Sequence, residues 1–261
     1  MSVDVVVCTK NRHRLLAELV NQINLFSYNR LVVVDGSEVP YVLESNGKDF
    51  VVHVPCARLG AARQIGLERC DSKYVFFVDD DTILTPSCLH ILYDALDHSG
   101  DARLVAVSGK VIYGNNDVVF RKLFSRTKAF GEGETGGFVL LKRKEVLLLG
   151  GFNSNIHWGE DVELRQRMNA KGLRWGRVPE AIAYHPWSFS KALRDMRRHG
   201  GGCRSAVNVN GGFFGMATRL VGRVFFMPLF YGLQTCDPRV FGYYSVMNLC
   251  LLYGFLCKTK T

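Results

Sequence analysis

Over the first 110 residues, short and continuously apolar runs alternate with segments whose apolar residues recur at helical spacing. The apolar runs are Val3–Cys8, Leu31–Asp35, Phe50–Val54, Tyr74–Asp79 and Arg103–Tyr113. Helical spacing is found in Arg12–Phe26, Leu59–Cys70 and Pro86–His98. Strands that are apolar on both faces and separated by helices are typical of a parallel sheet covered on both sides. We therefore expect an α/β fold with a mostly parallel sheet flanked by helices.

Polar residues stand where three of these runs end. Thr9–Arg12 follow the first run, Asp35–Ser37 follow the second, and the triple aspartate Asp79–Asp81 ends the fourth. In open α/β sheets, ligands bind beyond the carboxyl ends of the strands. We therefore expect these side chains to converge on one crevice.

Three consecutive carboxylates repel one another unless a cation lies between them. Asp79 and Asp81 are two residues apart, so in an extended chain their side chains point the same way. Carboxylate oxygens suit Mg²⁺ or Mn²⁺, which also bind substrate phosphates. The D-x-D pattern indicates a metal that bridges the protein to a diphosphate, and a solvated acidic turn is the alternative.

The second half contains a different set of elements. We expect a glycine-rich loop that enters a strand, a loop that leads into a helix, and two short strands before a histidine. The glycine-rich loop and its strand are Gly133–Arg143. The second loop and its helix are Gly150–Gly172, with the helix at Glu160–Ala170. The two short strands are Arg174–Val178 and Ala181–Tyr184, and His185 follows them.

With these motifs in this order, the chain resembles the family 2 inverting glycosyltransferases, which have the GT-A fold. The similar segments are VVVCTKNR, VVVDGS, LGAARQIGLERCDSKYVFFVDDD and GGFNSNIHWGEDVELRQRM, and the resemblance as a whole covers roughly residues 3–190. The resemblance implies transfer of a sugar from a GDP- or UDP-linked donor, assisted by Mn²⁺ or Mg²⁺. It identifies neither the sugar nor the acceptor.

Matching positions imply the roles of the residues on the donor side. Thr9 and Asp35 would border the base and ribose, and Arg63 would lie near the donor. Asp79 would contact the nucleotide and, together with Asp81, would bind the metal. The alternatives are a turn at Asp35, since Asp-Gly favours turns, and a surface helix charge at Arg63. The family often has Asn after this Arg, where this chain has Gln64.

His185 occupies the place of a further metal ligand in many relatives, and a buried, hydrogen-bonded histidine is the alternative.

Asp161 is the expected catalytic base, because a single displacement requires a carboxylate that takes the proton of the acceptor hydroxyl. It lies at the start of a predicted helix, whose N-terminus favours negative charge, with Glu160 as a supporting residue. On the acceptor side, Gly136 and Gly137 would allow close backbone approach, and Trp158 would stack on a sugar ring. The alternatives are a first-turn acid pair, a tight turn and a core tryptophan.

After residue 190 the chain is first basic and then apolar. Residues 191–223 contain seven Lys or Arg and one Asp, and Val240–Cys257 is 18 residues long without a charge. Together with Phe213–Leu233 it predicts a helical hairpin. We expect a glycosyltransferase domain at 1–190 and a membrane-associating C-terminal region at 191–261. A pair of buried helices or a dimer interface is the alternative.

Charge and cysteine usage bear on location and partners. The net charge of +9 favours anionic partners, here an anionic membrane and a lipid or lipid-linked acceptor rather than nucleic acid. The eight cysteines include no C-x-x-C pair, so a zinc site is not expected. The N-terminal residues show no signal peptide. We therefore expect the protein at the cytoplasmic face of the cell membrane.

Two other functions compete with this interpretation. A non-enzymatic basic protein that binds nucleotide, nucleic acid or membrane would explain the charge but not the acids at the strand ends. A sugar-1-phosphate nucleotidyltransferase would also bind nucleotide and metal, but its first loop is rich in glycine, and CTKNRH contains none.

Overall fold

The computed structural model describes residues 1–43, 47–113, 136–156, 159–186 and 238–256, together with short stretches between residues 197 and 233. The chain forms two compact units. The first comprises Met1–Ile112, Glu132–Asn155 and Glu160–His185, and the second comprises Tyr113–Gly131, Ile156–Gly159 and Pro186–Thr261. The division into domains at residue 190 stays a prediction.

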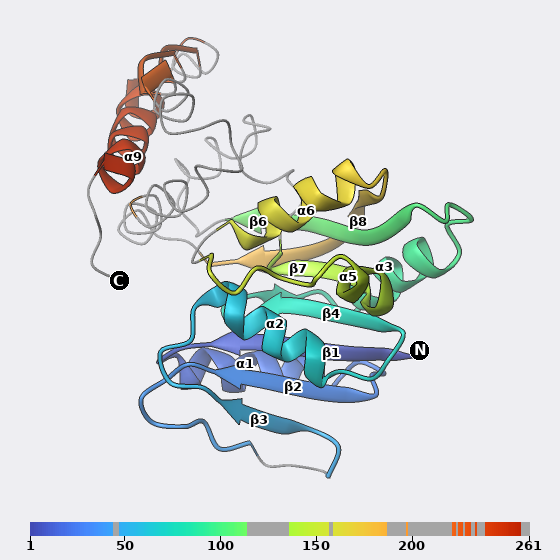
Figure 1. Ribbon diagram of the computed structural model, residues 1–261. Helices are drawn as coiled ribbons and strands as arrows, with labels where there is room; N and C mark the ends of the chain where they lie inside the picture. Colours follow the sequence, from blue (N-terminus) through green and yellow to red (C-terminus); the bar gives the residue numbers. More distant parts are fainter. Residues whose placement is uncertain are drawn as a thin grey trace. The chain divides into compact units, whose positions relative to one another are not determined.

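In the described part of the chain, eight strands form one sheet in the order β3-β2-β1-β4-β7-β6-β8-β5 (Figure 1). Strands β1 to β4 are parallel to their neighbours within this group, β7 is antiparallel to β4 and β6, and β5 is antiparallel to β8. The strands are β1 Val3–Thr9, β2 Arg30–Asp35, β3 Phe50–His53, β4 Tyr74–Asp79, β5 Ile83–Leu84, β6 Leu104–Tyr113, β7 Phe138–Lys142 and β8 Arg174–His185. The predicted α/β class with a mostly parallel sheet is confirmed.

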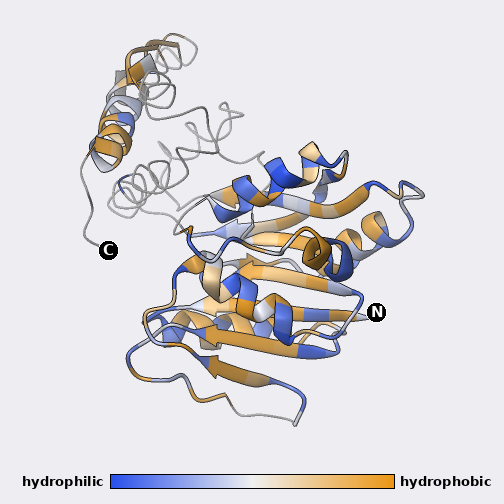
Figure 2. Ribbon diagram, in the orientation of Figure 1, coloured by the Kyte–Doolittle hydropathy of each residue, from blue (hydrophilic) through white to orange (hydrophobic). Residues whose placement is uncertain are grey.

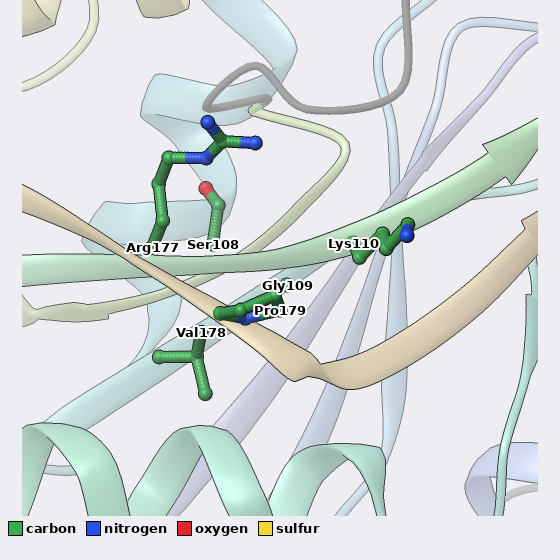
Figure 3. A pocket seen from close by; sticks show the side chains of 6 residues that line it. All are labelled: Ser108, Gly109, Lys110, Arg177, Val178 and Pro179. Atoms are coloured by element: carbon green, nitrogen blue, oxygen red, sulfur yellow. The ribbon is translucent and has the colours of Figure 1, made fainter. Parts of the chain in front are cut away.

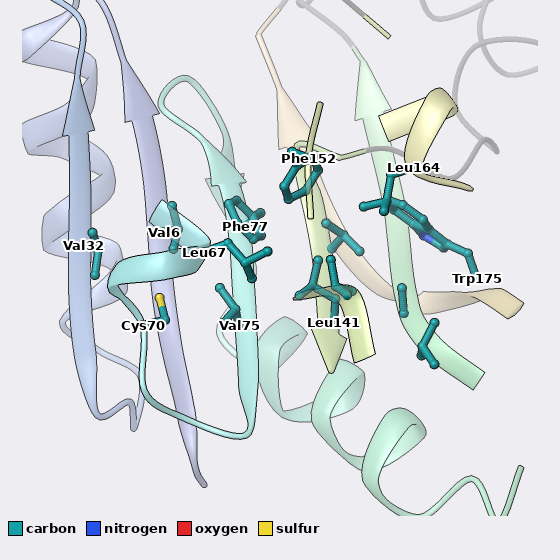
Figure 4. Packing of buried hydrophobic residues seen from close by; sticks show 14 of the residues in the cluster. Val6, Val32, Leu67, Cys70, Val75, Phe77, Leu141, Phe152, Leu164 and Trp175 are labelled. Atoms are coloured by element: carbon teal, nitrogen blue, oxygen red, sulfur yellow. The ribbon is translucent and has the colours of Figure 1, made fainter. Parts of the chain in front are cut away.

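Helices cover both faces of the sheet. They are α1 His13–Ile23, α2 Leu59–Arg69, α3 Cys88–Asp97, α5 Arg143–Leu148 and α6 Glu160–Ala170. Leu67 of α2, Val146 of α5 and Leu164 of α6 pack in one buried cluster with strand residues such as Val6 and Phe77 (Figure 4). Helices α1 and α3 lie on the opposite face (Figure 1). Removal of this apolar surface from water is the main force that holds the layers together.

The pairing register brings the ends of four parallel strands to one edge of the sheet. Thr9 pairs with Asp35, Asp35 pairs with His53, and Cys8 pairs with Asp79. The polar residues that follow β1, β2 and β4 therefore start from neighbouring positions.

The predicted elements are present, with shifted ends in several cases. Strand β8 is one strand, whereas the sequence predicts two strands interrupted at Pro179. Proline lacks the N–H needed within a ladder but is tolerated at a sheet edge. Strand β5 pairs with β8 only at Tyr184 and Ala183, so Pro179 lies where β8 has no described partner on that side. Two short elements, β5 and α5, are absent from the predicted set.

The second unit contains helix α9, Pro238–Leu256, which confirms the predicted C-terminal helix. Most of the preceding predicted helix, Phe213–Leu233, lies outside the described residues. The strands and much of α9 are hydrophobic (Figure 2). None of the helices in the described part of the chain has the length and hydropathy needed to cross a membrane.

Helix α9 carries apolar side chains on two sides. One side is buried and contains Tyr243, Tyr244, Met247, Leu251 and Phe255. Another set, Phe241, Val246, Leu249, Tyr253 and Leu256, is exposed. We call this second set the exposed α9 stripe.

Candidate active site

Asp35, at the end of β2, is fully buried and organises the loop that follows it. Its Oδ1 accepts a hydrogen bond from the Ser37 N–H at 2.9 Å, and its Oδ2 accepts one from the Tyr41 N–H at 2.7 Å. Burial alone raises the pKa of Asp35, but hydrogen bonds from Ser37 and Tyr41 outweigh it and hold the pKa below its ordinary value. A charged Asp35 therefore fixes the shape of the loop beside the end of β1.

The triple aspartate at the end of β4 is surrounded by hydrogen-bond donors. Asp80 and Asp81 are almost completely buried, and Asp79 is partly exposed. Thr9 Oγ1 donates to Asp80 Oδ2 at 2.7 Å. Arg12 Nη1 donates to Asp80 Oδ1 at 2.9 Å and to Asp81 Oδ2 at 2.8 Å. Two strand ends and the start of α1 thus meet at one acidic cluster.

The pKa of Asp80 is about 6, well above the ordinary value of an aspartate. Burial is the largest cause, and the neighbouring Asp81 and Asp79 add to it, while Arg12 and Thr9 act in the opposite direction. The cluster therefore holds more negative charge than its own donors neutralise.

Arg63, in α2, joins this cluster to the start of α6. Its guanidinium is buried; Nη2 donates to Asp79 Oδ1 at 3.0 Å, and Nη1 donates to Glu160 Oε1. Burial lowers the pKa of Arg63, but the carboxylates of Glu160, Asp79 and Asp161 raise it above its ordinary value. Arg63 is therefore a fixed cation between the acids of β4 and those of α6.

Glu160 is buried, and its Oε2 has no hydrogen-bond partner in the described part of the chain. Burial raises its pKa to about 7, against the lowering effect of Arg63. A carboxyl group in this state holds a proton near neutral pH.

The turn at Gly136 and Gly137 packs against the same groups. The Gly136 N–H donates to Asp161 Oδ2 at 2.9 Å, and the Asp79 N–H donates to the Gly137 carbonyl at 3.0 Å. A Cβ atom on Gly136 would lie 2.2 Å from Arg63 Nη1, and one on Gly137 would lie 2.0 Å from Asp79 Oδ2. These two positions therefore require glycine for close approach.

His185 ends β8 and lies beside the triple aspartate. Its Nε2 is 2.8 Å from Asp81 Oδ1, so the two groups can share a bound cation. Within the described ranges, no three His, Cys, Asp or Glu side chains are grouped to hold a metal ion. Mg²⁺ and Mn²⁺ commonly take one or two protein ligands and fill the remaining positions with water and substrate phosphates. The Asp81–His185 pair is compatible with that kind of site.

The structure brings most of the predicted site residues together. Side-chain contacts through Asp80 and Arg12 connect Thr9 to Asp81 and His185. Arg63 and the glycine turn connect Asp79, the first residue of the same triple aspartate, to Glu160 and Asp161. Asp35 adjoins the cluster through its pairing with Thr9. Trp158 and most of the basic segment Lys191–Arg204 lie outside the described residues.

Two members of the cluster, Arg12 and Asp80, were expected to lie in the crevice with the other strand-end residues but were assigned no role in the site. Both lie within motifs that the sequence shows at strand ends, CTKNR and VDDD. Their position after the carboxyl ends of strands indicates that they lie near the site. The contact between them depends on how the fold brings the two strand ends together.

A separate cavity of about 280 Å³ lies between β6 and β8 (Figure 3). Lys110 and Arg177 contribute cationic groups to its lining, while Ser108 and Arg177 project to one side of the strands and Val178 to the other (Figure 3). The Ser108 hydroxyl accepts a hydrogen bond from Trp175 Nε1 at 2.7 Å. None of the acidic residues described above lines this cavity.

Curated relatives resemble this chain over much of its length. Pre-mycofactocin glycosyltransferases from two strains of Mycobacterium tuberculosis, CDC 1551 / Oshkosh and ATCC 25618 / H37Rv, are 28% identical to it over 207 residues. The alignment covers 70% of this chain and 42% of each relative. The chain therefore matches less than half the length of these proteins.

Solved structures share the fold. The mannosyltransferase PcManGT from Pyrobaculum calidifontis, in complex with GDP-Man and Mn²⁺, superposes with a TM-score of 0.65 at 16% identity, covering 97% of this chain and 85% of that one. GalNAc-T7 with UDP, GalNAc and Mn²⁺ superposes with a TM-score of 0.58 at 14% identity, covering 78% and 51%. These similarities confirm the GT-A-like fold.

The model of the family described as "Glycosyl transferase family 2" matches residues 4–151, which contain β1 to β4, the triple aspartate and Arg63. With this match over more than half of its length, the chain belongs to glycosyltransferase family 2.

Proposed function

We propose that the protein is a metal-dependent, inverting glycosyltransferase that moves a hexose from a GDP- or UDP-linked donor to a lipid or lipid-linked acceptor. One observation carries the proposal: Arg63 and the Gly136–Gly137 turn connect the aspartates at the end of β4 to Asp161. A group that holds the leaving diphosphate and a group that accepts a proton are thereby kept in a fixed relation.

On the donor side, Asp81 and His185 would hold a Mn²⁺ or Mg²⁺ ion, with Asp79 beside them. The bound ion would neutralise the charge that develops on the leaving diphosphate. Both solved relatives named above carry Mn²⁺ and a nucleotide, GDP-linked in one and UDP in the other, which supports this chemistry. Asp35 and Thr9 shape the neighbouring strand ends, where the nucleoside would lie.

On the acceptor side, Asp161 is the proposed general base. The Gly136 N–H and the Val162 N–H donate to its two oxygens at 2.9 and 2.8 Å, so its orientation is fixed. The acceptor oxygen attacks the anomeric carbon, its proton passes to Asp161, and the bond to the diphosphate oxygen breaks on the opposite face. The result is one displacement with inversion.

The acceptor and location rest on the second unit. The exposed α9 stripe presents Phe241, Val246, Leu249, Tyr253 and Leu256 to solvent, and Arg197 is exposed and lies over the Tyr253 ring at 5.1 Å. An apolar surface bordered by a cation suits the interface of an anionic membrane. These features support the proposal that the protein acts at the cytoplasmic face of the cell membrane, on a lipid or lipid-linked acceptor.

Donor screening tests this function. The purified chain is mixed with Mn²⁺ and each of a set of GDP- and UDP-sugars, and thermal unfolding and donor turnover are followed together. A ligand that binds only the native state raises the unfolding temperature. We expect at least one donor to stabilise the protein only with metal, and Asp161→Asn to retain that stabilisation but lose turnover. Equal stabilisation by RNA or by metal-free nucleotide would favour the non-enzymatic alternative.

A further inference from the structure

Arg12 is the only residue in the described part of the chain whose guanidinium contacts both Asp80 and Asp81. One nitrogen, Nη1, donates to Asp80 at 2.9 Å and to Asp81 at 2.8 Å. The two aspartate side chains are 6% and 4% exposed, whereas that of Arg12 is 37% exposed. The arginine therefore covers the acid pair from the solvent side.

The backbone at Arg12 is fixed although its side chain is partly exposed. Asn11 has a positive φ of 57°, and its N–H donates to Ser37 Oγ at 2.7 Å. The Arg12 carbonyl accepts the first hydrogen bond of α1, from the Leu16 N–H at 3.0 Å. The backbone contacts of Arg12 are therefore independent of the direction in which its side chain points.

The two aspartates differ in their other partners. Asp80 is held on its second oxygen by Thr9, an uncharged donor, while Asp81 is held on its second oxygen by His185. Asp81 and His185 are the pair suited to a divalent cation, whereas the described partners of Asp80 are Thr9 and Arg12. The two aspartates therefore have different roles: Asp80 holds Arg12, and Asp81 is the ligand for the metal.

Charge decides what happens when a divalent cation arrives. Two carboxylates and one guanidinium carry a net charge of −1. A divalent ion changes this to +1, so Arg12 and the ion repel each other while both attract a diphosphate. A like charge close to a binding site disfavours binding of the second cation, and an anion placed between two cations removes that penalty.

We propose that Arg12 competes with the divalent cation for Asp81 in the donor-free protein, and moves to the donor diphosphate once metal is bound while Asp80 keeps it nearby. Arg12 would then be a diphosphate-binding residue that makes metal binding depend on the donor. This inference rests on the function proposed above. It predicts that removal of Arg12 changes metal affinity and diphosphate affinity in opposite directions.

Manganese titration tests the proposal. Free Mn²⁺ is measured by its electron paramagnetic resonance signal in the wild-type protein and in Arg12→Gln, with no nucleotide present. Binding of GDP and of UDP is then measured by calorimetry at saturating Mn²⁺. We expect Arg12→Gln to bind Mn²⁺ alone about tenfold more tightly and the nucleoside diphosphate about tenfold more weakly, since one charge at contact distance is removed.

Arg14→Gln is the matched control, because Arg14 lies two residues after Arg12 in the first turn of α1, forms an ion pair with Glu18, and has a side chain that is 91% exposed. It should reproduce the wild-type affinities. If the wild-type protein binds both Mn²⁺ and nucleotide but Arg12→Gln behaves like the control, or shifts both affinities in one direction, the role of Arg12 is refuted and the proposed function stands. If the wild-type protein binds neither, both fail.

Arg12→Met serves as a second variant that keeps the apolar stem. Cooperative thermal unfolding of either variant, measured beside Arg14→Gln, establishes that the fold is intact. Loss of folding in both would contradict the proposal, since a side chain that leaves Asp81 during each cycle cannot be required for the fold.

Discussion

The Gly136 N–H donates a hydrogen bond to Asp161 Oδ2 at 2.9 Å, which ties the turn before β7 to the first turn of α6. The same turn lies against Arg63 and Asp79, so that no side chain fits at Gly136. The proposed base and the acids at the end of β4 are thereby held by one short piece of backbone.

Substitution of Gly136 by alanine should disturb this arrangement. The new Cβ would lie 2.2 Å from Arg63 Nη1 and 2.8 Å from Asp161 Cβ, so both side chains must move. We expect sugar transfer to fall about 100-fold, because misplacement of a catalytic group by 1 Å has that order of effect. Gly242→Ala in α9, where the Cβ meets no atom within 4 Å, is the control. Equal rates for the two variants would show that the turn does not position Asp161.

Arg63 should be important for stability as well as for the site. At pH 8, where the Glu160 carboxyl is ionised, Arg63→Met leaves it buried without its cation, and removal of one partner from a buried ion pair costs about 3–5 kcal/mol. Urea unfolding measures this cost. Arg69→Met, at the exposed end of the same helix, should change the free energy of unfolding by less than about 0.5 kcal/mol. A cost for Arg63→Met as small as that of the control would contradict a buried role for Arg63.

The raised pKa of Glu160 makes stability depend on pH. The native carboxyl has a pKa of about 7 against an ordinary value of 4.5, so between these values the native state keeps a proton that the unfolded state releases. The stability gained from this proton is complete below pH 4.5 and is lost as pH rises through 7. The loss amounts to at most about 3 kcal/mol.

Glu160→Gln removes the titrating group, so its free energy of unfolding should not fall with the ionisation of residue 160. As pH rises from 5 to 8, the free energy of unfolding of the variant should therefore increase relative to that of the wild-type protein. Urea unfolding of both proteins at the two pH values gives the difference directly. The same difference at pH 5 and pH 8 would show that Glu160 does not titrate in this range.

The exposed α9 stripe should bind membranes. Combined replacement of Phe241, Leu249 and Tyr253 by serine removes large apolar groups from the proposed interface without touching the buried side of α9. We expect co-sedimentation with phosphatidylserine-containing vesicles to fall at least tenfold. Leu148→Ser in α5, which is 78% exposed in the first unit, is the control. Unchanged vesicle binding by the triple variant would show that the exposed α9 stripe does not contact the membrane.

Local sequence patterns predicted the scaffold well. The helix Glu160–Ala170 and the strand Tyr74–Asp79 have the predicted ends, because apolar runs and first-turn acids depend on neighbouring residues alone. Strand β8 was divided wrongly at Pro179, because the sequence does not reveal that this position lies at an unpaired edge.

The site was predicted as a set of residues but not as a set of contacts. Motif order predicted roles for the aspartates, Arg63 and Asp161, and these roles stay predictions. The contact between Arg63 and Glu160 was not predicted, because it joins residues 97 positions apart. The contact of Arg12 with both Asp80 and Asp81 depends on the left-handed backbone at Asn11, which the sequence CTKNR does not announce. Ion pairs between residues far apart in the sequence depend on the fold, so sequence motifs did not predict them.

The most direct test of the central claim is whether Mn²⁺ still enhances nucleotide binding in Asp81→Asn. Calorimetric titration of GDP and UDP with and without Mn²⁺ should show metal-enhanced binding in the wild-type protein and in Asp161→Asn, and none in Asp81→Asn. Enhancement by Mn²⁺ that persists undiminished in Asp81→Asn would contradict the assignment of the acidic cluster at the end of β4 as the site of metal and diphosphate.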